Sequence, residues 1–397
     1  MQFKPRLLAA LLAPLALAGA ARAETSPYGV AVSQQFVRDS NVLRAIDAAA
    51  QSDTISASGL RLMLDQPLGR HRLHASASYD MNRYSNLDYL NNNSYQADVG
   101  LDWTAAGLWR GEVGASASNQ LFLYDLSTVT PVSEKTEERT DRVFARARVG
   151  VVTAFTFDAG FENYRRTYST ERFQSRDLNW RRADMGVRWQ PQPDFNVRGA
   201  VSYSEGEYPQ LSTGDEFTRN ELRTDVFWRP SGASTVDASA SVSRERHSLQ
   251  TSRSATYWSG SVKWAWQPTG KLGVSTRVVR DSDAGASDQG SVLADAKLRT
   301  TFEVTGNWLA TSKVNVQVQA RRVQRQIDST FLVLTTAQQA SDATHTLSVA
   351  ASYQPMRSVE LGCRLQREQR SVGNANALLT YAFNANVASC YGQLWWR

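Results

Sequence analysis

The residues best suited to binding chemistry are arginines that alternate with small or apolar residues. Arg146 and Arg148 lie two positions apart, and Arg188 and Arg198 stand on either side of a Pro-containing turn. A guanidinium group presents N–H donors in a planar fork that matches carboxylate and phosphate groups. We therefore predict that these four arginines form a basic patch for anionic or hydroxyl-rich solutes.

Further charged residues follow the same spacing and are expected on the same polar surface, which would line a lumen. The predicted lumen-lining set is Arg146, Arg148, Arg188, Arg198, Arg223, Arg277, Arg299, Arg321, Asp158 and Asp184. Because the set contains both signs of charge, cross-strand ion pairs that only hold a wall together are an equally good interpretation. The sequence leaves both alternatives open.

Catalysis has little support. The chain has four histidines: His71 and His74 beside a tight turn, His247 at a loop, and His345 near another loop. None has a serine and an acid in register, as a hydrolytic triad needs. Metal-ligand spacings and glycine-rich phosphate loops are also missing from the sequence. We predict that the protein is not an enzyme and uses no metal or cofactor.

The two cysteines form a candidate pair near the C-terminus. Cys363 and Cys390 are roughly equidistant from Asn376, so they can face each other across the last two strands. The bacterial periplasm permits disulfides, and the spacing of paired strands fits one. The alternative is two small, unpaired apolar side chains.

An alternation of period two runs along nearly the whole chain and sets where these residues lie. In segment 314–321 Val314, Val316 and Val318 alternate with Asn315 and Gln317. A period of two places the two sets on opposite faces of a β-sheet. Tight turns such as "RPSGAS" and "QPTGKL" recur about every 38 to 46 residues, which indicates a repeated hairpin.

The length of the strands decides between two all-β architectures. Strands of soluble sandwiches are usually about 5 to 6 residues long, and a tilted strand that crosses a bilayer needs about 9 to 11. The alternating segments here run for about 10 to 14 residues. Such a sheet must close in a membrane, where open edges leave backbone groups unpaired. We predict a single transmembrane antiparallel up-and-down β-barrel of about 18 strands, with 16 to 20 compatible, short periplasmic turns and longer extracellular loops.

Tryptophans gather beside the short turns. An indole ring in a lipid interface lies among the head groups while its N–H reaches water. We predict that the lipid-interface aromatics are Trp103, Trp189, Trp228, Trp264, Trp266 and Trp308.

The N-terminal segment has the features of a secretory signal. Lys4 and Arg6 precede an apolar stretch, and Ala21-Arg22-Ala23 matches a cleavage site. We predict a cleaved signal peptide at 1–23, a barrel at 24–397 and residence in the bacterial outer membrane. Cleavage lowers the formal charge of +6 to about +3, and the basic residues are dispersed, so no nucleic-acid partner is expected.

The chain resembles a known group of β-barrel porins. The similar features are "SPYGVAVSQQFVRDSNVLR", with Asp39-Ser40-Asn41 and Leu43-Arg44, and the turns "WQPTGKL" and "YQPMRSVEL". Within the group, the chain is most similar to the exosortase-associated, EpsL-like outer-membrane proteins of exopolysaccharide operons. The resemblance implies a role in making or exporting an extracellular polysaccharide.

Three functions follow as hypotheses. The first is a conduit through whose polar lumen a sugar polymer slides along weak, repeated contacts. The second is a general diffusion porin for small solutes, and the third is a plugged barrel that acts as an assembly platform or adhesin. The expected partners are membrane lipid and lipopolysaccharide, exopolysaccharide, the barrel-assembly machinery and periplasmic polysaccharide-export components.

Overall fold

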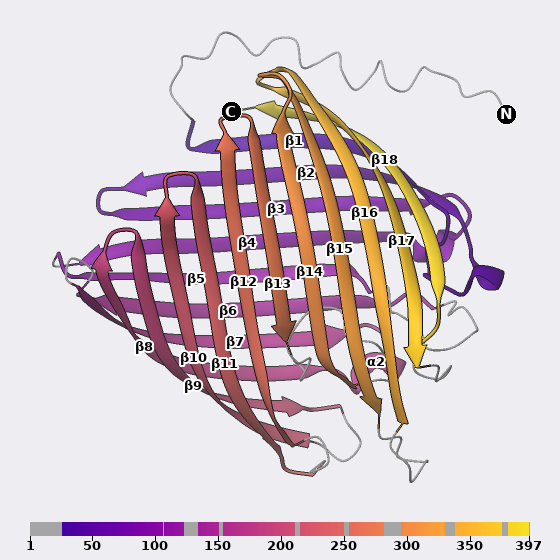
Figure 1. The fold of residues 1–397 in the computed structure, drawn as a ribbon. Coiled ribbons are helices and arrows are strands. Elements are labelled where there is room, and N and C mark those ends of the chain that lie inside the picture. Colours follow the sequence, from indigo (N-terminus) through magenta and orange to yellow (C-terminus); the bar gives the residue numbers. More distant parts are fainter. Residues whose placement is uncertain are drawn as a thin grey trace.

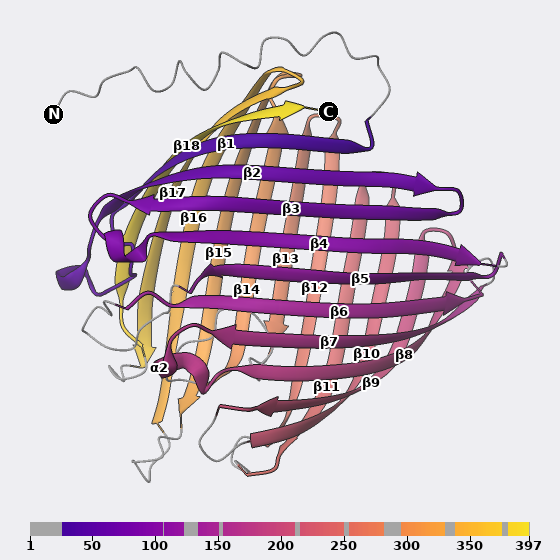
Figure 2. The same ribbon diagram turned by 180° about the vertical axis from the view of Figure 1, so that it is seen from behind.

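The computed structural model is a single closed sheet of 18 antiparallel strands, shown in Figure 1 and from behind in Figure 2. It describes residues 26–105, 107–122, 134–150, 154–210, 215–249, 254–281, 295–329, 338–374 and 380–396. Each strand pairs with its neighbours in the chain, and β18 pairs with β1 to close the sheet. The prediction of an up-and-down barrel of 18 strands is confirmed.

The strands are 10 to 19 residues long, as a tilted membrane crossing requires. The first nine are β1 Tyr28–Asp39, β2 Asp53–Leu68, β3 His71–Tyr84, β4 Asn92–Ala105, β5 Trp109–Leu121, β6 Glu137–Val149, β7 Phe155–Tyr168, β8 Leu178–Gln192 and β9 Phe195–Tyr208. The second nine are β10 Asp215–Ser231, β11 Ser234–His247, β12 Ala255–Thr269, β13 Leu272–Asp281, β14 Asp295–Leu309, β15 Val314–Ser329, β16 Gln338–Met356, β17 Val359–Asn374 and β18 Phe383–Trp396.

The two ends of the barrel differ. At one end, the turn end, strands are joined by tight turns such as that between Leu68 and His71, where Gly69 has a φ of 65°. At the other, the loop end, connections are longer and include η2 (Asp47–Ala49), η3 (Asp88–Leu90) and α2 (Glu171–Gln174). Both β1 and β18 meet the turn end, where Val30 pairs with Trp396.

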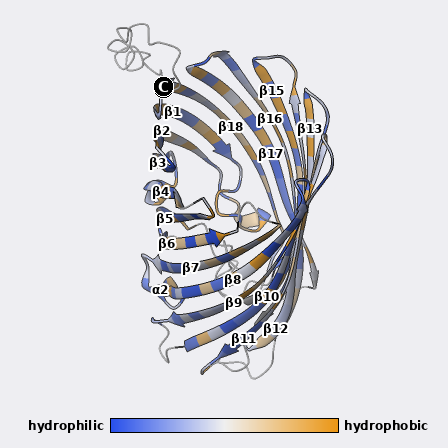
Figure 3. Ribbon diagram, turned by 90° about the vertical axis from the view of Figure 1, so that its left-hand side faces the viewer, coloured by the Kyte–Doolittle hydropathy of each residue, from blue (hydrophilic) through white to orange (hydrophobic). Residues whose placement is uncertain are grey.

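Alternation along the strands creates two different faces, as Figure 3 shows for hydropathy. Outward positions carry exposed apolar side chains: Met185, Leu222 and Leu365 are 61–65% exposed. Inward positions on the same strands carry polar and charged groups such as Asp184 and Arg223. The apolar face of each strand therefore points out of the barrel and not into a core, as a membrane protein requires.

Helices contribute little to this architecture. Within the described residues, no helix has the length and apolar character needed to cross a bilayer. The predicted signal peptide, residues 1–23, lies outside the described residues.

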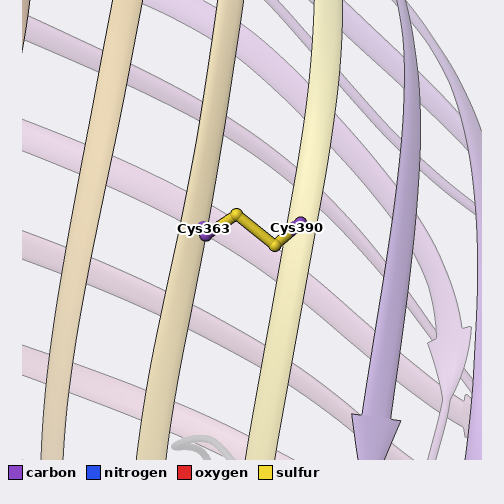
Figure 4. Close-up of a disulfide and its surroundings, with 2 residues drawn as sticks. All are labelled: Cys363 and Cys390. Carbon is purple, nitrogen blue, oxygen red and sulfur yellow. A yellow bond between two sulfur atoms is a disulfide. The ribbon is translucent and has the colours of Figure 1, made fainter.

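Cys363 of β17 and Cys390 of β18 lie directly opposite each other and are joined by a disulfide (Figure 4). Both occupy outward positions, in line with the exposed Leu361 and Leu365 on β17. The disulfide therefore joins the two strands of the last hairpin on the lipid-facing side, next to the seam where β18 pairs with β1.

We expect the disulfide to stabilise the barrel. It closes a loop with a sequence separation of 27, and loss of such a cross-link costs about 3 to 4 kcal/mol of unfolding free energy in the chain-entropy description. Urea unfolding of the refolded Cys363→Ser/Cys390→Ser variant, followed by tryptophan fluorescence, measures this loss. Reduced wild-type protein should match the variant, and equal midpoints for oxidised wild type and variant would contradict a stabilising role.

Candidate solute-binding site in the lumen

A cavity of about 510 Å³ lies on the inner wall of strands β6–β12. The strands alternate in and out, so each sends every second side chain into the lumen. Six arginines and five carboxylates line the cavity: Arg146, Arg148, Arg182, Arg188, Arg198, Arg223, Asp158, Glu162, Asp184, Asp225 and Asp237. The structure thus brings together all four arginines of the predicted basic patch, and it also places carboxylates among them.

Arg198 on β9 is the centre of this cluster. Its Nε donates to Asp158 Oδ1 at 2.9 Å, and its Nη2 group bonds both Asp158 and Asp184, the latter at 3.1 Å. Its Nη1 reaches Asp225 at 3.4 Å. These carboxylates come from β7, β8 and β10, so one guanidinium ties four strands together. Their side chains are 5–31% exposed, which leaves the cluster only partly accessible to water.

The other three arginines of the patch give the cavity a basic side. Arg148 lies opposite Arg110 on β5 and Asp158 on β7, and Arg188 lies opposite Arg198. The Nε atom of Arg188 is buried and has no hydrogen-bond partner among the described residues. A buried donor without a partner is unfavourable, so an acceptor from a solute would be stabilised here.

The remaining lumen candidates lie on the inner face and divide into two groups. Arg223 lines the same cavity and donates to Asp225 at 2.7 Å. Arg277, Arg299 and Arg321 belong to strands β13–β15 and do not line the cavity. Two of these three form ion pairs along the wall: Arg299 with Asp281 at 2.9 Å, and Arg321 with Glu303 at 4.0 Å. For these the wall-bracing interpretation fits the contacts better than a solute site.

A second charged cluster at the loop end was not predicted. The ring nitrogens of His247 contact Asp215 Oδ2 at 2.7 Å and Glu245 Oε1 at 2.8 Å. Arg219 Nε donates to Glu245 at 2.7 Å. The sequence predicts no serine and acid in register with His247, and its ring nitrogens contact two acids. Glu245 lies two positions before it on the same face, a spacing that could have revealed this pair.

An aromatic lining adjoins that cluster. Leu178, Trp180, Tyr208 and Phe217 form a buried group on the inner face of β8–β10. On β8 and β9 these residues have the opposite parity to the outward Met185 and Val201, and on β10 Phe217 has the opposite parity to the outward Leu222, so the lumen becomes more apolar towards the loop end. Aromatic side chains at these inward positions were missed because the tryptophans were considered only as lipid contacts.

One acidic group in the loops has a shifted pKa. Burial raises the pKa of the Asp177 carboxyl, although a hydrogen bond from the backbone N–H of Tyr168 and the charges of Arg165 and Arg166 oppose the shift. Asp177 precedes β8 and caps the connection from β7.

The predicted interface tryptophans all take outward positions close to the turn end. Those with the largest exposed fractions are 41–52% exposed: Trp189, Trp228, Trp264, Trp266 and Trp308. Trp103 also points outward, where it packs over Gly111 of β5. The rings of Trp264 and Trp266 stack at 6.0 Å, and the Trp264 indole N–H donates to Ser234 at 2.8 Å.

Metal binding has no support from the geometry. Across the described ranges, no group of three or more histidine, cysteine, aspartate or glutamate side chains is arranged to hold a metal ion. The arginines and carboxylates that line the cavity offer charge pairing and hydrogen bonding to a solute.

Comparisons with known proteins bear on the fold. No known protein family matches the sequence, and no curated protein matches it. Among solved structures, the chain is similar to OccAB3 of Acinetobacter baumannii, with 8% identity over 93% of this chain and 98% of that one, and a TM-score of 0.50. It is also similar to the outer membrane protein OpdK of Pseudomonas aeruginosa (10% identity, 93% and 99% coverage, TM-score 0.49) and to the siderophore receptor PirA of Acinetobacter baumannii (8%, 92% and 80%, 0.44).

Proposed function

We propose that the protein forms an outer-membrane channel for small polar solutes and favours anions. The observation that carries this proposal is the arginine-rich cavity on the inner wall of a closed 18-stranded barrel. Barrels of 16 to 18 strands are wide enough to enclose an aqueous channel. A lumen lined by fixed charges selects solutes by sign and by hydrogen bonding.

The two faces of the barrel support the membrane placement. Outward apolar side chains form the lipid contact, and the tryptophans at the turn end mark one interface. Short turns are typical of the periplasmic side and long loops of the extracellular side. Export through the predicted signal peptide at 1–23 and assembly by the barrel-assembly machinery belong to the same proposal.

A small solute suits the site better than a sugar polymer. Arg198 holds three carboxylates in fixed pairs, which leaves Arg148 and Arg188 as a compact basic site. A polymer that slides needs weak contacts repeated along its path, whereas one strong site would stall it. Exopolysaccharide export, its periplasmic partners and the EpsL-like assignment rest on the resemblance of the N-terminal segment and the turn motifs, and the comparisons add no support for them.

The anion preference predicts the effect of a double substitution. Arg148→Gln/Arg188→Gln removes two positive charges from the cavity. At about 8 Å in water, each charge contributes about 0.5 kcal/mol, attractive for an anion and repulsive for a cation, and screening by about 0.1 M salt roughly halves both contributions. The anion-to-cation permeability ratio should therefore fall about fivefold. The reversal potential of single channels in a planar bilayer under a salt gradient measures this ratio.

Arg277→Gln/Arg321→Gln is the matched control, since both residues face the lumen outside the cavity. It should change the ratio less than the cavity variant does. Equal effects of the two variants would show that selectivity is spread over the wall. A folded barrel without conductance would instead indicate a plugged lumen, and block by host polysaccharide fragments alone would favour the polymer conduit.

A further inference from the structure

The outward face carries a second set of arginines at the loop end. On several strands an arginine stands two positions beyond the last outward apolar side chain, as Arg367 does beyond Leu365 and Arg38 beyond Phe36. A side chain at this level lies where the apolar band ends and lipid head groups begin. The set comprises Arg38, Arg83, Arg139, Arg165, Arg181, Arg244, Arg246, Arg280, Arg322 and Arg367.

Charge is distributed unevenly around this rim. On β6–β9 the outward arginines have carboxylate neighbours: Arg165 lies opposite Asp141, Arg181 lies opposite Glu205, and Arg139 forms an ion pair with Asp141. On β11–β18 and β1, no outward strand position with a described side chain is acidic. One side of the rim is therefore charge-balanced and the other is purely basic.

A groove of about 700 Å³ lies in this basic sector, on the outer wall of β16–β18 and β1. Its floor is apolar and is formed by Leu347, Val349 and Leu365 around the small side chain of Ala388. Arg38 lies opposite Ala388, and Arg367 lies opposite Asn386. The two arginines thus stand on either side of β18, separated by two strand spacings of about 5 Å each.

The surroundings leave both guanidinium groups available to an anion. Among the described residues, Arg38 donates to neutral groups, the hydroxyls of Thr54 at 3.0 Å and Ser52 at 3.2 Å. Arg367 is exposed on the same surface. An apolar groove that ends between two arginines is complementary in shape and charge to a molecule that has an acyl chain and a phosphate at one end.

We propose that this groove binds one phosphorylated glycolipid of the outer leaflet. Its phosphate is held by Arg38 and Arg367, and one acyl chain lies along Leu347 and Leu365 over Ala388. The lipid would then cover the β1–β18 seam, beside the disulfide of the last hairpin. This inference rests on the proposed membrane placement and not on the channel activity.

The test is retention of diphosphorylated lipid A by the refolded barrel in phosphatidylcholine nanodiscs, measured by native mass spectrometry. Wild type should retain about one lipid A, and Arg38→Gln/Arg367→Gln should retain about tenfold less, since both charge-assisted contacts are lost. Arg165→Gln/Arg181→Gln, which removes rim arginines that lie opposite carboxylates, should retain the wild-type amount.

A further variant and a conductance measurement distinguish the remaining outcomes. Ala388→Phe fills the groove and keeps both arginines, so it should also lose lipid A, and it covers the case in which the arginine variant does not fold. Equal retention by all variants, or displacement of lipid A by excess inorganic phosphate, would overturn the proposal. Unchanged single-channel conductance in the groove variants would show that lipid binding and channel activity are independent of each other.

Discussion

Replacing Arg198 by methionine should lower the unfolding free energy of the barrel by about 2 to 4 kcal/mol. The substitution keeps an unbranched apolar stem, removes the guanidinium group and leaves Asp158, Asp184 and Asp225 close together without their shared partner. Removing one partner of a largely buried ion pair costs about 3 to 5 kcal/mol. We expect somewhat less here, because Asp225 is partly exposed to the lumen and Arg148 and Arg188 remain nearby.

The measurement is equilibrium unfolding in urea of the refolded barrel in lipid vesicles, followed by tryptophan fluorescence. Arg223→Gln is the matched control: Arg223 lines the same cavity but bonds Asp225 alone and is 41% exposed, so its loss should cost about 1 kcal/mol or less. If both variants unfold at the same urea concentration, Arg198 is not the centre of the cluster. Asp158→Asn added to the Arg198 variant should recover part of the loss, because it removes one of the uncompensated carboxylates.

The fold could be predicted because its signals are local. A period of two, repeated over strands long enough to cross a bilayer, leaves few architectures. Chain order then determines which strands pair, because hairpins connect neighbours. The strand boundaries are the least certain part: the predicted strand 108–124 is observed as β5, Trp109–Leu121.

The faces of individual residues follow from the same alternation, so the arginines could be assigned to the inner wall. Their partners could not, because contacts between strands depend on register. Arg198 reaches Asp158 across β8, two strands away, and no spacing in the sequence encodes that distance. The pairing of Cys363 with Cys390 is the exception, because their equal distance from Asn376 made it a candidate before the register of the last hairpin was known.

Two further features could not be predicted from the sequence: the outer groove at Ala388 and the buried cluster around His247. The groove at Ala388 depends on four strands that lie side by side in space, with a small residue between larger ones. The loop-end cluster around His247 depends on Asp215, which comes from a neighbouring strand 32 positions earlier. Sequence patterns assign a face to each residue, but they do not show which residues lie at the same height on the wall.

Replacing His247 by leucine should destabilise the loop end of β10 and β11. We expect the free energy of unfolding of this end to fall by about 3 to 5 kcal/mol. The His247 ring is 1% exposed and lies between Asp215, 0% exposed, and Glu245, 4% exposed. The two ring nitrogens lie within hydrogen-bonding distance of one carboxylate each, Asp215 at 2.7 Å and Glu245 at 2.8 Å. Leucine fills a similar volume but removes the ring nitrogens that contact both buried carboxylates, so part of the compensation of their charge is lost.

The loss should be local, because the cluster lies beyond the outward apolar band, whose last member on β11 is Val242. We therefore expect protease cleavage near the β10–β11 loop end of the refolded variant at concentrations that leave wild type intact, while the membrane-embedded part of the barrel persists. His345→Leu is the control, since His345 is on the exposed outer face and its loss should change nothing. Adding Asp215→Asn and Glu245→Gln to His247→Leu should restore much of the resistance, because the uncompensated charges are then removed. If that triple variant is as sensitive as His247→Leu alone, the ring supports the loop end by packing against Phe217 and not by charge.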